Sequence, residues 1–186
     1  MDNRLQFLEA NVRITHQALI EQSKAGNSNA QYQLYALYVD AMFNTAYRLL
    51  SSREDAEDIL QESFVEAFKK LDSFRFESTF GAWLKRIVVN RSINFLRSKR
   101  MIFVATEVSE EAIPEESNDV NQPLQVEKVK KGIAQLPEGY RQIITLYLIE
   151  GYDHVEISEI LDISTSTSKS QYHRAKRKLI GILNEM

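Results

Sequence analysis

The sequence predicts an all-α protein made of two small domains, and three observations support this fold class. Apolar residues recur every three or four positions over long segments, whereas runs that alternate as in a strand are few. The 186 residues include only three prolines and six glycines, so helices are seldom interrupted. With 44% hydrophobic residues, the chain can bury a real core in each domain.

An acidic segment divides the chain into two helical parts. The helical pattern extends over residues 14–101, stops between 102 and 125, and resumes over 126–186. Segment 102–125 lacks periodicity and contains two of the three prolines, which predicts a flexible linker. Residues 1–13 are expected to form an N-terminal tail. The predicted architecture is therefore two helical domains on an acidic tether.

Charge is segregated into blocks along the chain, although the net charge is only −3. Residues 54–66 contain six acids and no base, and residues 101–127 contain seven acids and no base. Residues 81–100 carry six Lys or Arg and no acid. Surfaces of opposite sign on one molecule indicate that its different parts meet different partners.

Composition excludes several classes of protein. The chain has no cysteine, which removes disulfides, cysteine-bound zinc and thiol catalysis. Asp2, Arg4 and Glu9 interrupt any apolar run at the N-terminus, so no signal peptide is expected. No apolar stretch approaches the length of a bilayer span. The expected location is the cytoplasm, without insertion into a membrane.

Residues 153–183 are the most informative stretch, because they predict two helices joined by a short turn. The first helix has one apolar face at helical spacing, formed by Ile157, Ile160 and Leu161. Residues 162–164 supply the turn, and Ser164 can cap the N-terminus of the second helix.

The second helix of this pair combines an inward face with dense positive charge. Four residues at helical spacing are expected to face inward: Ser168, Tyr172, Ala175 and Leu179. Between residues 169 and 178 the helix carries five Lys or Arg and no acid. An exposed helix of one sign attracts phosphate, although charged amphipathic stretches are commonly solvated surface helices. The turn spacing favours a DNA-binding helix-turn-helix over that alternative.

The acidic block at 54–66 predicts a helix with two unlike faces. Its inward face is formed by Ala56, Leu60, Ser63, Phe64, Ala67 and Leu71. Its opposite face gathers Asp55, Asp58, Glu62 and Glu66. These carboxylates permit three interpretations: a solvated face, a docking surface for a basic partner, or a metal site for phosphodiester chemistry. No histidine lies nearby and no second acidic motif completes a metal site, so neither a metal nor another cofactor is expected.

The next segment interleaves aromatic side chains with basic and amide groups. A helix core explains Trp83, Leu84, Ile87 and Val88. Phe74, Phe76 and Phe80 lie in an expected loop among Ser, Arg and Thr. If these rings are exposed beside a positive helix, they offer faces on which bases taken out of a duplex can stack. The alternative is that the loop phenylalanines fold under into the core.

In this order, the motifs resemble bacterial RNA polymerase sigma factors, and more narrowly the two-domain extracytoplasmic-function group. The resemblance is carried by DAEDILQE (55–62), LDSFR (71–75), STFGAWLKRI (78–87), VNRSINFLR (89–97), LPEGYRQI (136–143), and EISEILDIS followed by TST, KS and HRAKRKL. It covers residues 14–183 except the linker. Several independent motifs make it far more specific than a helix-turn-helix alone.

The resemblance implies a non-enzymatic subunit that gives RNA polymerase promoter recognition, helps to open DNA and serves a stress or envelope-signal regulon. The implied partners are the polymerase core, through its β′ and β subunits, and promoter DNA. An anti-sigma factor is a further option. In the family the acidic helix docks on a basic coiled coil of β′, which assigns core binding to Asp55, Asp58, Gln61 and Glu62. The linker would thread toward the active-site and RNA-exit channel.

The resemblance also assigns the DNA contacts. The segment after the acidic helix reads and melts the −10 element, with a flipped base captured by Asn90 and the loop 74–80 and with phosphates held by arginines. The residues assigned to −10 DNA are Phe74, Ser78, Phe80, Arg86, Asn90, Arg91 and Arg97. The helix-turn-helix reads the −35 duplex through base-facing Lys169, Ser170, His173 and Arg174 and through Thr167, Lys176 and Arg177 near the backbone.

Three residues depart from the family's pattern. Asn94 stands where many members have Asp, which changes one possible contact. In the recognition helix Ser168 replaces the usual valine and Gln171 the usual arginine, so the −35 preference is not carried over. No further C-terminal sensor domain is expected.

Two rival functions use fewer of these motifs. The first is an autonomous helix-turn-helix regulator with an N-terminal dimerisation or ligand domain. It gives no function to the acidic face of residues 54–66 or to the phenylalanines of the loop 74–80. A metal-dependent nuclease would act through Asp55, Asp58 and Glu62, and it would be active with Mg²⁺ and no polymerase. A sigma factor uses every motif, since polymerase would space two weak DNA-binding modules so that the second binds at high effective concentration.

Overall fold

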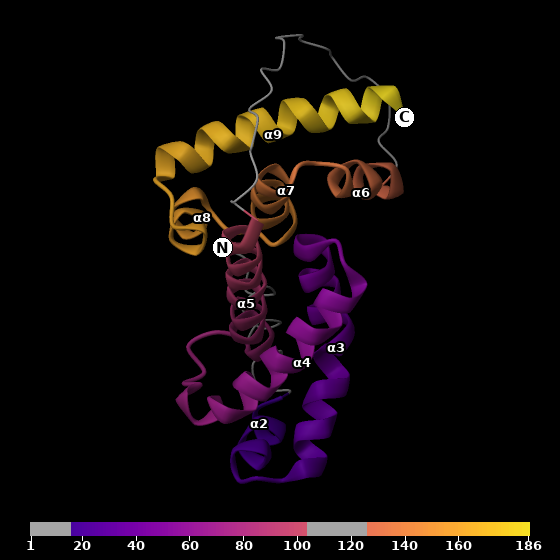
Figure 1. The fold of residues 1–186 in the computed structure, drawn as a ribbon. Helices are drawn as coiled ribbons and strands as arrows, with labels where there is room; N and C mark the ends of the chain where they lie inside the picture. Colours follow the sequence, from indigo (N-terminus) through magenta and orange to yellow (C-terminus); the bar gives the residue numbers. More distant parts are fainter. Residues whose placement is uncertain (1–15, 104–125) are drawn as a thin grey trace, which may run out of the picture. The chain divides into compact units, whose positions relative to one another are not determined.

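The computed structural model describes residues 16–103 and 126–186, and every regular element in these two ranges is helical (Figure 1). The predicted all-α fold class is therefore confirmed. The chain divides into two compact units, Met1–Asn94 and Phe95–Met186. They are called the N-terminal body and the C-terminal body below, and each is described by itself.

Two of the expected segments fall outside the described residues. The expected tail at 1–13 lies wholly outside them, and so does the expected linker from residue 104 to residue 125. In the described ranges, no helix combines the length and the apolar character needed to cross a membrane.

Polar side chains cap the N-termini of two helices in the N-terminal body. Its elements are α2 (Gln17–Lys24), α3 (Ser28–Leu50), α4 (Arg53–Lys69), the 3₁₀ turn η1 (Leu71–Ser73) and α5 (Phe80–Phe103), which continues past Asn94. The Asn27 side chain accepts hydrogen bonds from two backbone N–H groups of α3, and Ser52 accepts one from α4. These caps satisfy N–H groups that a helix leaves without partners in its first turn.

The core of the N-terminal body contains the predicted inward face of α4. All six predicted residues are buried: Ala56, Leu60, Ser63, Phe64, Ala67 and Leu71. Helix α3 packs against both α2 and α4. A ring contact of 5.2 Å between Tyr38 and Phe80 joins α3 to the start of α5. The acidic face of α4 is consequently turned away from this core.

The C-terminal body is built around the long helix α9. Its elements are α6 (Val126–Ala134), α7 (Glu138–Ile144), the π-helical turn η2 (Thr145–Ile149), α8 (His154–Leu161) and α9 (Thr165–Glu185). Figure 1 shows α9 lying along α6, α7 and α8, and it packs against all three. The core cluster contains Ile133, Leu136, Ile144, Ala175, Leu179 and Leu183.

Helices α8 and α9 form the predicted helix-turn-helix, with capped ends. Asp153 and Glu156 form a capping box at the start of α8. Asp162 ends α8 in the left-handed region, with φ of 55°. Ser164 caps α9 as predicted, because its Oγ accepts a hydrogen bond of 3.0 Å from the N–H of Thr167. The turn is thus fixed at both ends by local hydrogen bonds.

Two glycines in the helices of the C-terminal body provide a matched test of its packing. Gly181 in α9 has open space around its missing Cβ, so Gly181→Ala should raise the free energy of unfolding by about 0.5–1 kcal/mol. A Cβ on Gly132 in α6 would lie 3.0 Å from methyl carbons of Leu179 and Leu183. Gly132→Ala should therefore lose its helix-propensity gain to crowding. Urea unfolding followed by far-UV circular dichroism measures both; equal stabilisation would contradict the close approach of α6 to α9.

Candidate functional site

The solvent face of α4 carries an acidic stripe, defined here as Asp55, Asp58, Gln61, Glu62 and Val65. Asp58, Gln61 and Glu62 are exposed, as predicted, and Asp55 is half-buried. Val65 is 53% exposed and is the member that the sequence analysis missed. The sequence could have indicated its exposure, because Val65 lies outside the apolar face of α4. An exposed aliphatic side chain among carboxylates gives a partner both charge and apolar area to contact.

One arginine of α5 is paired with the acidic helix. Arg91 Nη1 donates to Glu62, and Arg91 Nε donates to Glu66 Oε2 at 2.5 Å. Lys70 Nζ also donates to Glu66, at 2.6 Å. These bonds, led by the one from Lys70, hold the pKa of Glu66 below its usual range. Arg91 therefore faces carboxylates of α4 in this state, although the resemblance assigned it to DNA phosphate.

The carboxylates of α4 do not meet the requirements of a metal site in this structure. Among the described residues, no three His, Cys, Asp or Glu side chains are grouped so that they could hold an ion. Glu62 and Glu66 are instead neutralised by cationic side chains. The arrangement supports docking or solvation, the other two interpretations of the acidic face.

Helix α5 presents the other predicted −10 residues to solvent. Arg86, Asn90 and Arg97 are exposed, whereas the Arg91 side chain is only 33% exposed. Asn94 is exposed as well. A row of cations and amides on a helix suits a nucleic-acid backbone and unpaired base edges.

Of the two alternatives for the loop phenylalanines, the structure supports burial for Phe74 and Phe80, which are 3% and 4% exposed. Phe74 lies 5.8 Å from Phe80 and 5.3 Å from Trp83, ring centre to ring centre. The loop folds under because large rings gain more from mutual burial than from contact with water. Only Phe76 keeps a partly exposed ring.

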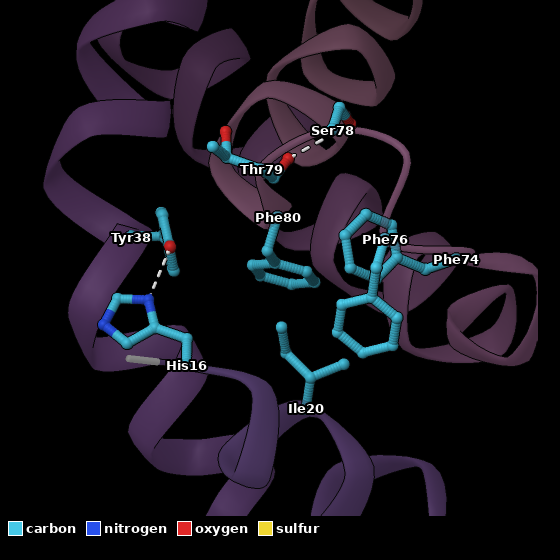
Figure 2. A pocket seen from close by; sticks show the side chains of 8 residues that line it. All are labelled: His16, Ile20, Tyr38, Phe74, Phe76, Ser78, Thr79 and Phe80. Carbon is cyan, nitrogen blue, oxygen red and sulfur yellow. Dashed lines mark hydrogen bonds between the residues drawn. The ribbon is translucent and has the colours of Figure 1, made fainter. Parts of the chain in front are cut away.

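The buried rings form the walls of a small pocket (Figure 2). It is lined by His16, Ile20, Tyr38, Phe74, Phe76, Ser78, Thr79 and Phe80. Its volume is about 30 Å³, enough for about two waters and too small for a nucleobase. A hydrogen bond of 2.8 Å joins His16 Nδ1 to the Tyr38 hydroxyl on one side of the pocket. Ser78, a predicted −10 residue, is exposed on the loop that borders it.

The loop over this pocket is held in an unusual conformation. Phe76 has φ of 60°, in the left-handed region that residues other than glycine seldom adopt. Lys24 of α2 donates a hydrogen bond of 3.0 Å to the Phe74 carbonyl, and its ammonium lies 4.9 Å from the centre of the Phe76 ring. Strain of this kind persists where surrounding contacts impose it.

Helix α9 separates its residues as predicted. Ser168, Ala175 and Leu179 are buried, and Tyr172 is half-buried. The exposed positions include six predicted −35 residues: Lys169, Ser170, His173, Arg174, Lys176 and Arg177. The seventh, Thr167, is half-buried beside the N-cap Ser164. An uninterrupted basic face in a helix-turn-helix is suited to the major groove.

Family models match both helical parts of the chain. Sigma-70 region 2 matches residues 34–101, and sigma-70 region 4 matches residues 127–179. The first match contains α4 and the loop of the pocket, and the second contains α8 and most of α9. The two candidate surfaces thus coincide with the two matched regions.

Relatives match over nearly the whole chain. The ECF RNA polymerase sigma factor SigW of Bacillus subtilis is 32% identical over 182 residues, covering 90% of this chain and 96% of the relative. The ECF RNA polymerase sigma-E factor of Escherichia coli K12 is 32% identical over 179 residues, covering 90% and 93%.

Solved structures are similar to this chain as well. The sigma factor RpoE, crystallised with the anti-sigma factor NepR from Bartonella quintana, is similar with a TM-score of 0.55 and 27% identity, over 82% of this chain and 96% of that one. CnrH in complex with the cytosolic domain of CnrY has a TM-score of 0.54 and 26% identity, over 90% and 96%. The chain therefore belongs to the ECF RNA polymerase sigma factors, non-enzymatic proteins that direct transcription initiation.

Proposed function

We propose that the acidic stripe docks the protein on a basic surface of the β′ subunit of core RNA polymerase. Asp58, Gln61 and Glu62 are exposed on one helix, and Asp55 borders them. Val65 adds apolar area that a partner would cover. Complementary charge steers such an encounter, and the apolar contact retains it.

The −10 element is proposed to meet α5 and the loop over the pocket. Arg86 and Arg97 would hold phosphates, and Asn90 would contact an unpaired base edge. Because the pocket in its present volume cannot admit a base, capture requires the loop 74–79 to open. Phe74 and Phe80 then act as pocket walls and Ser78 as a group at the entrance. Arg91 would join this surface after leaving both Glu62 and Glu66.

Helix α9 is proposed to read the −35 element in duplex DNA. Its exposed Lys169, Ser170, His173 and Arg174 lie nearest the helix N-terminus and would face base edges. Lys176 and Arg177 lie farther along and, with Thr167 at the turn, would contact the backbone. We assign residues 14–101 to −10 recognition and core binding, 126–186 to −35 recognition, and 102–125 to the linker.

The setting of this activity is also proposed by similarity. The protein would act in the cytoplasm, where RNA polymerase transcribes, on a stress or envelope-signal regulon like other extracytoplasmic-function factors. An anti-sigma factor is a proposed partner, because the similar RpoE was solved with one.

One observation carries the proposal: the same chain has an exposed acidic face on α4 and a basic helix-turn-helix. The test is run-off transcription from a promoter library with purified core polymerase and this protein. Discrete start sites that require both components are expected. Full promoter specificity of the protein without polymerase would support an autonomous regulator instead, and DNA cleavage with Mg²⁺ alone would support a nuclease.

Two arginines of α9 should respond differently to removal. Arg174 lies one turn after Ser170, so Arg174→Ala should cost about 1–3 kcal/mol at one −35 position and relax discrimination there. Arg177 lies a further turn from the helix N-terminus, near the phosphate backbone. Arg177→Ala should weaken binding to every sequence alike and lower the salt slope by about one unit.

The comparison is made in holoenzyme on a set of −35 variants at several salt concentrations. Each arginine is the control for the other, because both changes remove one positive charge from the same helix. If Arg174→Ala lowers transcription equally from every −35 variant, the reading face is misplaced.

A further inference from the structure

A cluster of rings joins three elements of the C-terminal body behind the recognition helix. His154 is the first residue of α8, and its imidazole stacks on Tyr147 of η2 with 4.6 Å between ring centres and 18° between planes. Tyr172 of α9 lies 4.6 Å from Tyr147 and 5.7 Å, edge-on, from His154. The imidazole is therefore the point at which η2, α8 and α9 meet.

The same imidazole is bonded to a buried hydroxyl of α9. His154 Nδ1 and Ser168 Oγ share a hydrogen bond of 3.0 Å, and Ser168 is 0% exposed. Ser168 is the residue that stands where the family usually has valine. A buried hydroxyl needs a partner, and here the imidazole nitrogen supplies it, so loss of that nitrogen would remove the hydrogen bond that ties α9 to α8. Lys169 and Ser170 follow directly on the exposed side of the helix.

We propose that His154 is a positioning residue for −35 recognition. Its contacts with Ser168 and Tyr147 hold the first turns of α9 in place. The inference rests on the proposed reading of the −35 element by α9. Hydrogen bonds to base edges weaken steeply with small errors in distance and angle. A shift of the first turn of α9 would therefore reduce discrimination between sequences more than it reduces attraction to phosphate.

The protonation state of His154 gives this role a distinct signature. Burial, followed by the charges of Lys169 and His173, lowers the pKa of His154 from its usual 6.5, and Asp153 opposes the effect. The groups around the ring are Asp153 before it, Tyr147 on η2, and Lys169, Tyr172 and His173 on α9. The neutral ring forms the contacts described, whereas a charged ring would repel these cations and the N-terminal end of the helix dipole.

The direction of the pH dependence follows from this pKa. Because the pKa of His154 is lower in the folded protein, its contribution to holding α9 in place is complete above pH 6.5. It is lost as the pH falls through the lowered pKa. Discrimination at −35 should decline with acidification in wild-type protein.

The test uses holoenzyme on templates randomised across the −35 segment, with sequencing of the transcripts. His154→Phe keeps an aromatic ring on Tyr147 but removes the hydrogen bond, and it should reduce −35 discrimination about fivefold or more. Ser168→Ala with His154→Phe removes both partners, so it should recover most of the loss. Glu159→Gln, an exposed change on α8, is the control and should leave discrimination unchanged.

A second arm measures the same discrimination in steps from about pH 7.5 down to about pH 5, the range in which histidine titrates. It is performed in a His173→Gln background, so that the exposed histidine of α9 does not contribute. Discrimination should fall at the lower pH, and His154→Gln should remove this dependence. Ratios between templates cancel effects of pH on the polymerase itself, and thermal unfolding confirms that each variant is folded.

The outcomes separate this inference from the proposed function. If wild-type holoenzyme enriches no −35 sequence, the proposed function of α9 fails. If the wild type enriches a sequence and folded His154→Phe retains its discrimination, the positioning role of His154 is overturned. A pH profile unaffected by His154→Gln would overturn it as well.

Discussion

Asp58→Lys should reduce association with core RNA polymerase by about 30-fold or more, corresponding to about 2 kcal/mol or more, because it turns charge complementarity into repulsion at the docking surface. Asp58 is exposed near the centre of the acidic stripe. Combining it with Glu62→Lys should abolish detectable association. The measurement is a titration of labelled core polymerase with the folded variants at fixed ionic strength.

Two comparisons make this test specific. Asp72→Lys changes the charge equally at an exposed residue of η1, outside the stripe, and should leave core affinity close to that of the wild type. Glu62→Lys also breaks the pair with Arg91, so the single Asp58 variant is the cleaner measure of docking. A folded double variant that binds core normally would remove the stripe from the interface.

The strongly periodic helices could be predicted from the sequence, because a helix repeats its buried face every turn. The inward residues of α4 and α9 follow this pattern, and Ser164 caps α9 through a bond to Thr167, three residues away. Such signals are local and do not depend on which element packs against the helix. The acidic stripe was predictable for the same reason, except for Val65, whose exposure adds apolar character to it.

Contacts between distant segments could not be predicted in this way. Arg91 meets Glu66 across 25 residues, and His154 meets Ser168 across a turn whose geometry decides their distance. The resemblance to sigma factors assigned Arg91 to DNA phosphate. The structure pairs it with both Glu62 and Glu66 of α4, and no local pattern of α5 reports these partners.

The loop phenylalanines show how tertiary packing overrides a local interpretation. Phe74 and Phe80 stand among polar residues in the sequence, and this pattern left both exposure and burial open. The structure surrounds them with Ile20 from α2 and Tyr38 from α3, at the pocket shown in Figure 2. No local pattern of the loop reports these partners. Base capture at this site therefore has to be tested by substituting exposed residues. Substitution of Phe74 tests the stability of the fold instead.

Phe74→Ala should destabilise the N-terminal body by about 3–5 kcal/mol, the usual result of replacing a buried phenylalanine. The ring is 3% exposed and lies 5.3 Å from Trp83, the single tryptophan of the chain. Fluorescence of Trp83 therefore reports the unfolding of this body, and urea titration measures the change.

Asn90→Ala is the matched variant on the exposed side of α5, and its free energy of unfolding should stay within about 0.5 kcal/mol of the wild type. Asn90→Ala should instead impair promoter opening, and a template with a pre-melted −10 bubble should show a smaller defect than duplex if melting is the affected step. If Phe74→Ala leaves the Trp83 transition unchanged, the ring contributes nothing to the stability of the core. If Asn90→Ala is as defective in closed-complex formation as in opening, the residue contributes to recruitment, because a contact made only after base flipping cannot strengthen binding to closed duplex.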